Sequence, residues 1–164
     1  MRYWLAACAA IATPVQAQTL WQQIYAGMPD TELRSRYPAE KGRVEYHDGW
    51  TELKGFVQVG SCKPDVSVSH PQGVVTKVKI EKIAMAGMFT KTCEAQVYSG
   101  LLAKYGDPIS QESDKENFLN ASEWKNRKTI WIIDDLTITL ERGLDMHQSW
   151  KLNYESSKRT ATGL

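Results

Sequence analysis

The cysteines at positions 62 and 93 are the residues of this 164-residue chain whose chemistry is easiest to anticipate. The third cysteine, Cys8, is expected to be removed with the first 17 residues, and the two thiols that remain allow one intramolecular disulfide in an oxidising compartment. Closing a loop of about 30 residues would stabilise the fold by roughly 3–4 kcal/mol on the chain-entropy model. The alternative is a redox-active or metal-binding thiol pair, but the sequence contains no C-x-x-C and no histidine at ligand spacing. We therefore expect a structural disulfide between Cys62 and Cys93.

The three histidines, His47, His70 and His147, each lie beside a turn signal. A metal site needs convergent ligands, and the sequence contains no H-x-x-x-H, no H-E-x-x-H and no Cys/His cluster. We therefore expect solvated turn histidines, with no metal and no cofactor.

Nucleophilic catalysis has equally little support in the sequence. No G-x-S-x-G motif occurs, and no glycine-rich loop could cradle a phosphate. The adjacent carboxylates of Asp134-Asp135 lie between two apolar β-type segments, where a solvated hairpin turn is the simpler interpretation. These observations favour a binding protein over an enzyme and identify no catalytic residue.

Aromatic residues are the more suggestive set, with five tryptophans after residue 17. Most of them must fill the core of so small a protein. Trp131 lies in "TIWIIDD", which is apolar on both faces and fits either a central strand or a strand with one face offered to a partner. Trp50 follows a turn and has polar neighbours, so we expect it to be exposed. Aromatic residues commonly anchor protein interfaces. The candidate partner-binding residues are Trp50, Trp131, Tyr46 and His47.

The first 17 residues have the pattern of a secretory signal. Arg2 provides the basic start, the segment 3–12 is apolar, and Val15-Gln16-Ala17 precedes a cut before Gln18. The alternative is lipidation of Cys8 in "LAAC", but a cut there would leave an apolar stretch of only residues 3–7. We expect cleavage between Ala17 and Gln18 and a periplasmic or secreted protein, with a lipid anchor on Cys8 as the alternative.

Length and charge limit the classes of protein to consider. Removing 17 of 164 residues leaves 147, the size of one ordinary domain. Loss of Arg2 reduces the 20 Lys and Arg to 19, equal to the 19 Asp and Glu. A chain without excess positive charge lacks the dense basic face of a sequence-independent nucleic-acid binder. No later segment approaches the roughly 20 apolar residues of a membrane span.

Apolar spacing predicts the elements that must position these residues. Helical spacing over 20–28 predicts a short helix or a turn that ends near Gly27, and Asp30 is expected to cap a second helix that Pro38 stops. Between 42 and 83 the pattern changes to period two, which predicts two hairpins that turn at 48–49 and 70–73.

The second half of the chain again has a predicted helix followed by predicted strands. An apolar stripe at four-residue spacing predicts a helix over about 92–105, ended by Gly106 and Pro108. The polar segment after this helix is expected to form a strand edge and a loop. Three further strands are expected in "EWKNRKTIWIIDD", "LTITLER" and "SWKLNYES".

Gly27-Met28, Leu33 and Tyr37-Pro38 resemble the motif that begins small envelope modules of the BamE/SmpA family and β-lactamase-inhibitory-protein-like domains. A later segment resembles another part of the same modules, with Val97, Leu101-Leu102, Tyr105-Gly106 and Pro108 followed by a strand that carries tryptophan. The resemblance implies a short helix pair packed on a three- or four-stranded antiparallel sheet. It also implies secreted proteins that bind other proteins and catalyse nothing.

These observations predict an α+β fold with helices packed on one face of an antiparallel sheet, in two tandem helix-then-meander blocks. We expect one compact domain over 18–156, with sub-blocks 18–85 and 86–156, and a flexible tail over 157–164. The expected function is binding of another protein or an envelope component. The alternative is a small-molecule-binding protein or a hydrolase with a pocket between helix and sheet.

Overall fold

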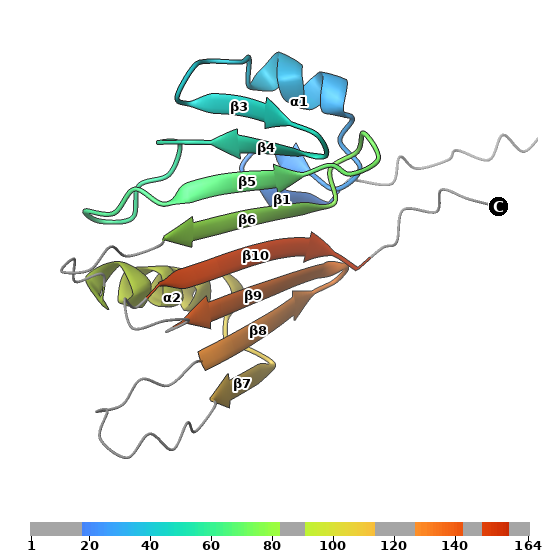
Figure 1. The fold of residues 1–164 in the computed structure, drawn as a ribbon. Coiled ribbons are helices and arrows are strands. Elements are labelled where there is room, and N and C mark those ends of the chain that lie inside the picture. The colour runs from blue at the N-terminus through green and yellow to red at the C-terminus, as the bar shows by residue number, and fades with distance from the viewer. Residues whose placement is uncertain (1–17, 83–90, 114–126, 143–148, 158–164) are drawn as a thin grey trace, which may run out of the picture.

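A computed structural model describes residues 18–82, 91–113, 127–142 and 149–157 (Figure 1). The elements of the first part are β1 (Thr19–Trp21), β2 (Ile24–Tyr25), α1 (Asp30–Arg36), β3 (Val44–His47), β4 (Trp50–Leu53), β5 (Asp65–Ser69) and β6 (Lys77–Lys82). Those of the second part are α2 (Lys91–Tyr105), β7 (Ser110–Ser113), β8 (Arg127–Ile133), β9 (Leu136–Arg142) and β10 (Trp150–Ser156).

Eight of the strands form a single antiparallel sheet in the order β3-β4-β5-β6-β10-β9-β8-β7. Each half of this sheet is a meander, and both predicted hairpin turns, at 48–49 and 70–73, are confirmed. The halves are joined where β6 pairs with β10, from Trp150 opposite Lys82 to Glu155 opposite Lys77. In Figure 1 this junction lies at the middle of the sheet, with α2 behind it.

One face of the sheet carries the hydrophobic core. A row of aliphatic side chains that are at most 5% exposed runs across five neighbouring strands and through the β6–β10 junction. Its members are Leu53, Val66, Ile80, Leu152 and Leu140. Burial of each such side chain contributes roughly 1.5–3 kcal/mol. The two halves of the sheet therefore share one continuous apolar layer.

Of the two alternatives predicted for residues 20–28, the helix is wrong, because this segment forms the β1–β2 hairpin. Gln22 adopts a left-handed backbone conformation with a φ of 49°, so the chain reverses after Trp21. Leu20 and Ile24, on either side of this reversal, are both buried in the core. Backbone bonds between Gly27 and Val75 and between Val75 and Met28 then attach the segment to the chain that leads into β6.

The predicted α+β fold, with helices packed on one face of the sheet in tandem helix-then-meander blocks, is also wrong. The described chain is mostly β, and its two helices have only 7 and 15 residues. The two meanders are the two halves of one eight-stranded sheet rather than separate blocks. The error arose because apolar residues four apart also fit a tight hairpin, and because no local pattern specifies the pairing of β6 with β10.

The two helices agree with their predicted positions, with one difference in capping. The N-cap of α1 is Pro29 and makes no side-chain cap, whereas Asp30 lies inside the first turn and pairs with Arg34 at 2.8 Å. α2 covers the predicted 92–105 segment. It is attached to the sheet by the Trp131 indole, which donates to the Gly106 carbonyl at 2.9 Å, and by an ion pair between Glu94 and Arg142.

None of the described helices is long and apolar enough to cross a membrane. Several expectations lie outside the described residues: the signal segment with Ala17, the boundary between residues 85 and 86, Trp124, His147 and the tail beyond residue 157.

Candidate functional site

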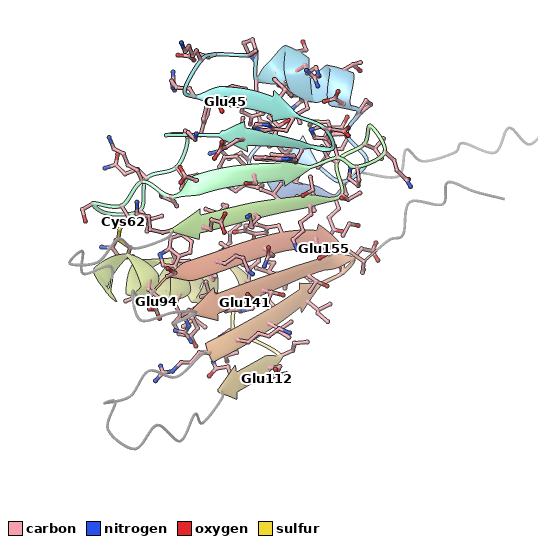
Figure 2. All side chains as sticks on the ribbon, viewed as in Figure 1. Glu45, Cys62, Glu94, Glu112, Glu141 and Glu155 are labelled. Atoms are coloured by element: carbon pink, nitrogen blue, oxygen red, sulfur yellow. A yellow bond between two sulfur atoms is a disulfide. The ribbon has the colours of Figure 1, made fainter. Side chains whose placement is uncertain are left out.

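The face of the sheet opposite the core, here called the open face, is the main surface to consider. Its residues alternate with the core positions along the strands: Glu45, His47, Trp50, Glu52, Asp65, Ser67, Ser69, Lys77, Lys79, Glu81, Ser110, Glu112, Lys128, Ile130, Ile132, Thr137, Thr139, Glu141, Lys151, Asn153 and Glu155. All except Asn153 are at least partly exposed. Figure 2 labels four glutamates of this face, from β3, β7, β9 and β10.

Ion pairs occupy the middle of the open face. Lys79 contacts Glu81 at 2.6 Å along β6, Lys151 contacts Glu141 at 2.8 Å between β10 and β9, and Lys77 lies 3.8 Å from Glu155. Such partly exposed pairs contribute at most about 1 kcal/mol each. Their effect here is to make the centre of the face polar and close to neutral.

The β3–β4 hairpin provides the aromatic end of the open face. Its two-residue turn, Asp48-Gly49, places His47 opposite Trp50. The imidazole and indole rings are stacked, with 3.9 Å between centroids and an interplanar angle of 14°. Trp50 is 38% exposed, so one tryptophan of the described chain is available on this surface together with a histidine.

Two strand residues further from the turn, Glu45 lies opposite Glu52. Glu45, His47 and Glu52 each offer one ligand atom, and these three atoms lie within 4.8 Å of one another. The three residues are therefore a candidate set of metal ligands. The Lys54 ammonium lies 3.1 Å from Glu52. Its hydrogen bond to Glu52 raises the pKa of Lys54, and the charges of Glu52, Glu45 and Asp65 raise it further, against a small opposing effect of burial.

The predicted partner-binding residues do not form one surface. His47 and Trp50 are neighbours on the open face, as described above. Tyr46 points to the opposite side, where its hydroxyl donates to the Tyr37 carbonyl and Arg34 covers its ring at 4.0 Å. Trp131 is 1% exposed in the core, so it cannot contact a partner in this fold.

The aliphatic position that strand β8 does expose is Ile132, with 50% of its surface accessible. The sequence shows that Trp131 alternates with its isoleucine neighbours, but it does not decide which face of the strand is directed to the core. The core is on the tryptophan side, and Ile130 and Ile132 therefore lie on the open face.

The predicted disulfide is confirmed: Cys62 and Cys93 are bonded, with 6.1 Å between their Cα atoms. It joins the segment between β4 and β5, where Cys62 pairs with Val59, to the beginning of α2 (Figure 2). Both residues are buried. In this oxidised form neither sulfur is a thiolate that could act as a nucleophile or a metal ligand.

His70 is not the solvated turn histidine that was predicted, because it is only 4% exposed. Its Nε2 atom lies 2.8 Å from Oγ1 of Thr51 and 3.8 Å from Oδ1 of Asp30. A hydroxyl beside an imidazole can form an activated nucleophile. Thr51 is completely buried, however, and a substrate cannot reach it in this conformation. The contact with Thr51 instead holds the 70–73 turn against β4, and the Asp30 backbone N–H, which donates to the Gly73 carbonyl at 2.8 Å, holds it against α1.

No known protein family matches the sequence, and neither does any curated protein. The crystal structure of a DUF4309 family protein (YjgB) from Bacillus subtilis is similar, with a TM-score of 0.43 and 12% sequence identity over 87% of this chain and 86% of that one. A TM-score this low does not establish a shared fold.

Proposed function

We propose that this protein is exported and non-catalytic, and that it binds a protein partner on the open face of its sheet. The observation that carries the proposal is the extent of this face. It spans all eight strands, and no described element packs against it, whereas β1, β2, α1 and α2 contribute buried residues to the core on the other side.

The size of the open face suits a protein partner. Eight strands about 4.8 Å apart span about 34 Å, and strands of this length extend for about 20 Å. The resulting area of about 700 Å² is close to the roughly 800 Å² that each partner buries in a typical protein interface. A small molecule would cover only a fraction of it.

The arrangement of the exposed apolar residues supports the same conclusion. Trp50 and Ile132 belong to one row of side chains across the sheet, connected by the pairs Trp50↔Ser69, Ser69↔Lys77, Lys77↔Glu155, Glu155↔Thr137 and Thr137↔Ile132. Five strand spacings place these two anchors about 24 Å apart. A ligand that contacts both must have a surface of protein dimensions.

The location that we propose is the periplasm or the extracellular medium. The disulfide supports it, because disulfides persist in oxidising compartments and are rare in the cytosol. Release after Ala17 would leave a free protein that begins at Gln18, and the alternative is retention by a lipid on Cys8.

Site-specific photo-crosslinking in the native compartment tests this proposal. A photo-crosslinking amino acid replaces Trp50 in one variant and Ile132 in another, and the matched control carries it at Lys104, which is exposed on α2. We expect the first two variants to give an adduct with the same partner protein, identified by mass spectrometry, and the control to give none.

A substitution then tests the contribution of the tryptophan. If Trp50 is an interface hot spot worth about 2 kcal/mol, Trp50→Ala lowers the affinity for the identified partner by about 30-fold. Adducts of equal yield from all three positions would contradict the proposal. So would an adduct that contains only a second copy of this chain, or an unchanged affinity of the alanine variant.

A further inference from the structure

The side chains of Glu45, His47 and Glu52 converge because of the register of the β3–β4 hairpin. Glu45 and His47 are two residues apart on β3 and point to the same face, and Glu52 lies directly opposite Glu45 on β4. Their ligand atoms lie within 4.8 Å of one another. Three potential ligands are therefore held by a paired backbone rather than by a loop.

The facing glutamates are unfavourable without a cation. Like charges directly opposite each other on adjacent strands destabilise a sheet. Lys54 offsets part of this repulsion, but its ammonium lies beside Glu52, 3.1 Å from that carboxylate. A second positive charge between the two carboxylates would relieve the repulsion more completely.

The histidine ring is held in place by its neighbour on the next strand. Trp50 stacks on the His47 ring at 3.9 Å, which restricts the rotation of the imidazole. The carboxylates, in contrast, are at the ends of flexible stems and can adjust to a ligand.

We propose that Glu45, His47 and Glu52 bind a divalent metal ion, with zinc as the preferred ion. One imidazole nitrogen and two carboxylate oxygens are ligands that zinc accepts. Bonds of 2.0–2.2 Å in a tetrahedral site place ligand atoms about 3.3–3.6 Å apart, so the three ligand atoms must approach one another by rotation of the side chains when the ion binds. The fourth position is left to water or to a group from a partner.

Isothermal titration of Zn²⁺ into the purified, disulfide-bonded protein without a polyhistidine tag tests the proposal. We expect one equivalent to bind with a micromolar dissociation constant. Glu45→Gln, His47→Gln and Glu52→Gln should each weaken binding at least about tenfold, since even residues that only support a ligand contribute that much. The matched control is Glu112→Gln, which removes a carboxylate from β7 on the same face and should leave the affinity unchanged.

The substitution Lys54→Met should change the affinity for zinc in the opposite direction to the ligand substitutions. Because the ammonium competes with the metal for Glu52, its removal should strengthen zinc binding several-fold. An NMR titration supplies a second readout, in which the imidazole ¹⁵N resonances of His47 shift on zinc addition and those of buried His70 do not.

Absence of zinc binding would overturn the proposal, and so would affinities of the three ligand variants equal to that of the unmodified protein. Equal weakening by Glu112→Gln would also overturn it, because it would indicate diffuse attraction to surface charge. The proposal does not rest on partner binding, and the titration contains no partner, so it can fail while the proposed function stands.

Discussion

Burial in the sheet changes the pKa of one residue, Tyr154. Tyr154 is 7% exposed in β10, and desolvation, with a smaller contribution from Tyr105, raises the pKa of its hydroxyl well above the ordinary value of 10.0. The unfolded chain therefore loses this proton at a lower pH than the folded protein. The stability associated with Tyr154 is complete below pH 10 and decreases as the pH rises above that value.

We expect Tyr154→Phe to reduce the loss of stability in alkali. The free energy of unfolding of the unmodified protein should fall by up to about 1.4 kcal/mol per pH unit above pH 10 through this residue, and the variant should lack that contribution. Urea unfolding at pH 8, 10 and 11 measures the difference. Tyr46→Phe, with a half-buried ring, is the control and should change the slope less. If the free energy of unfolding of Tyr154→Phe and that of the unmodified protein fell equally with rising pH, this expectation would be refuted.

At the scale of elements, the disulfide links the helix α2 to the first meander. The bond between Cys62 and Cys93 fixes the beginning of α2 to the segment that follows β4. The two cysteines are 31 residues apart in sequence. A cross-link of this span chiefly restricts the unfolded chain, so its removal should affect stability more than it affects the folded arrangement.

The double substitution Cys62→Ala and Cys93→Ala should lower the free energy of unfolding by roughly 3–4 kcal/mol on the chain-entropy model. Chemical denaturation at pH 7 measures this change, and circular dichroism of the native protein should retain its strand signal. Each single alanine variant serves as a control that also lacks the bond. A change below about 1 kcal/mol in the double variant would show that the bond does not restrict the unfolded chain as the chain-entropy model requires.

At the scale of the whole molecule, the β6–β10 junction makes one sheet out of two meanders. Leu152 lies at this junction, between Ile80 of β6 and Leu140 of β9, and is 5% exposed. A side chain in this position contacts both halves of the core. A cavity made there should therefore weaken the whole sheet rather than one half.

We expect Leu152→Ala to destabilise the protein by about 2–5 kcal/mol while unfolding remains a single transition. Far-ultraviolet circular dichroism reports the sheet and tryptophan fluorescence reports the core, and the two denaturation curves should coincide in the variant as in the unmodified protein. Ile132→Ala, on the open face, is the control and should change stability by less than about 1 kcal/mol. Separate transitions would instead indicate two units that fold independently and would contradict the single domain predicted over 18–156.

Much of the candidate zinc site was accessible from sequence. A two-residue turn at Asp48-Gly49 fixes His47 opposite Trp50 and Glu45 opposite Glu52 by counting alone. Histidine motifs at helical spacing do not include this set, because ligands on paired strands are related through the turn and not by a fixed interval along one element. Exposure of Trp50, in contrast, was predicted from its polar neighbours.

The sequence by itself determined the local features: the disulfide partners, the helix α2 and both hairpin turns of the first meander. The helix and the turns depend on residues whose backbone preferences act over a few positions. The disulfide depends on two cysteines that have no alternative partner. Only the tertiary structure decided that residues 20–28 form a hairpin, that Trp131 faces the core and that β6 pairs with β10. These outcomes depend on which apolar surfaces meet across the chain, and the free energy of that burial outweighs local propensity.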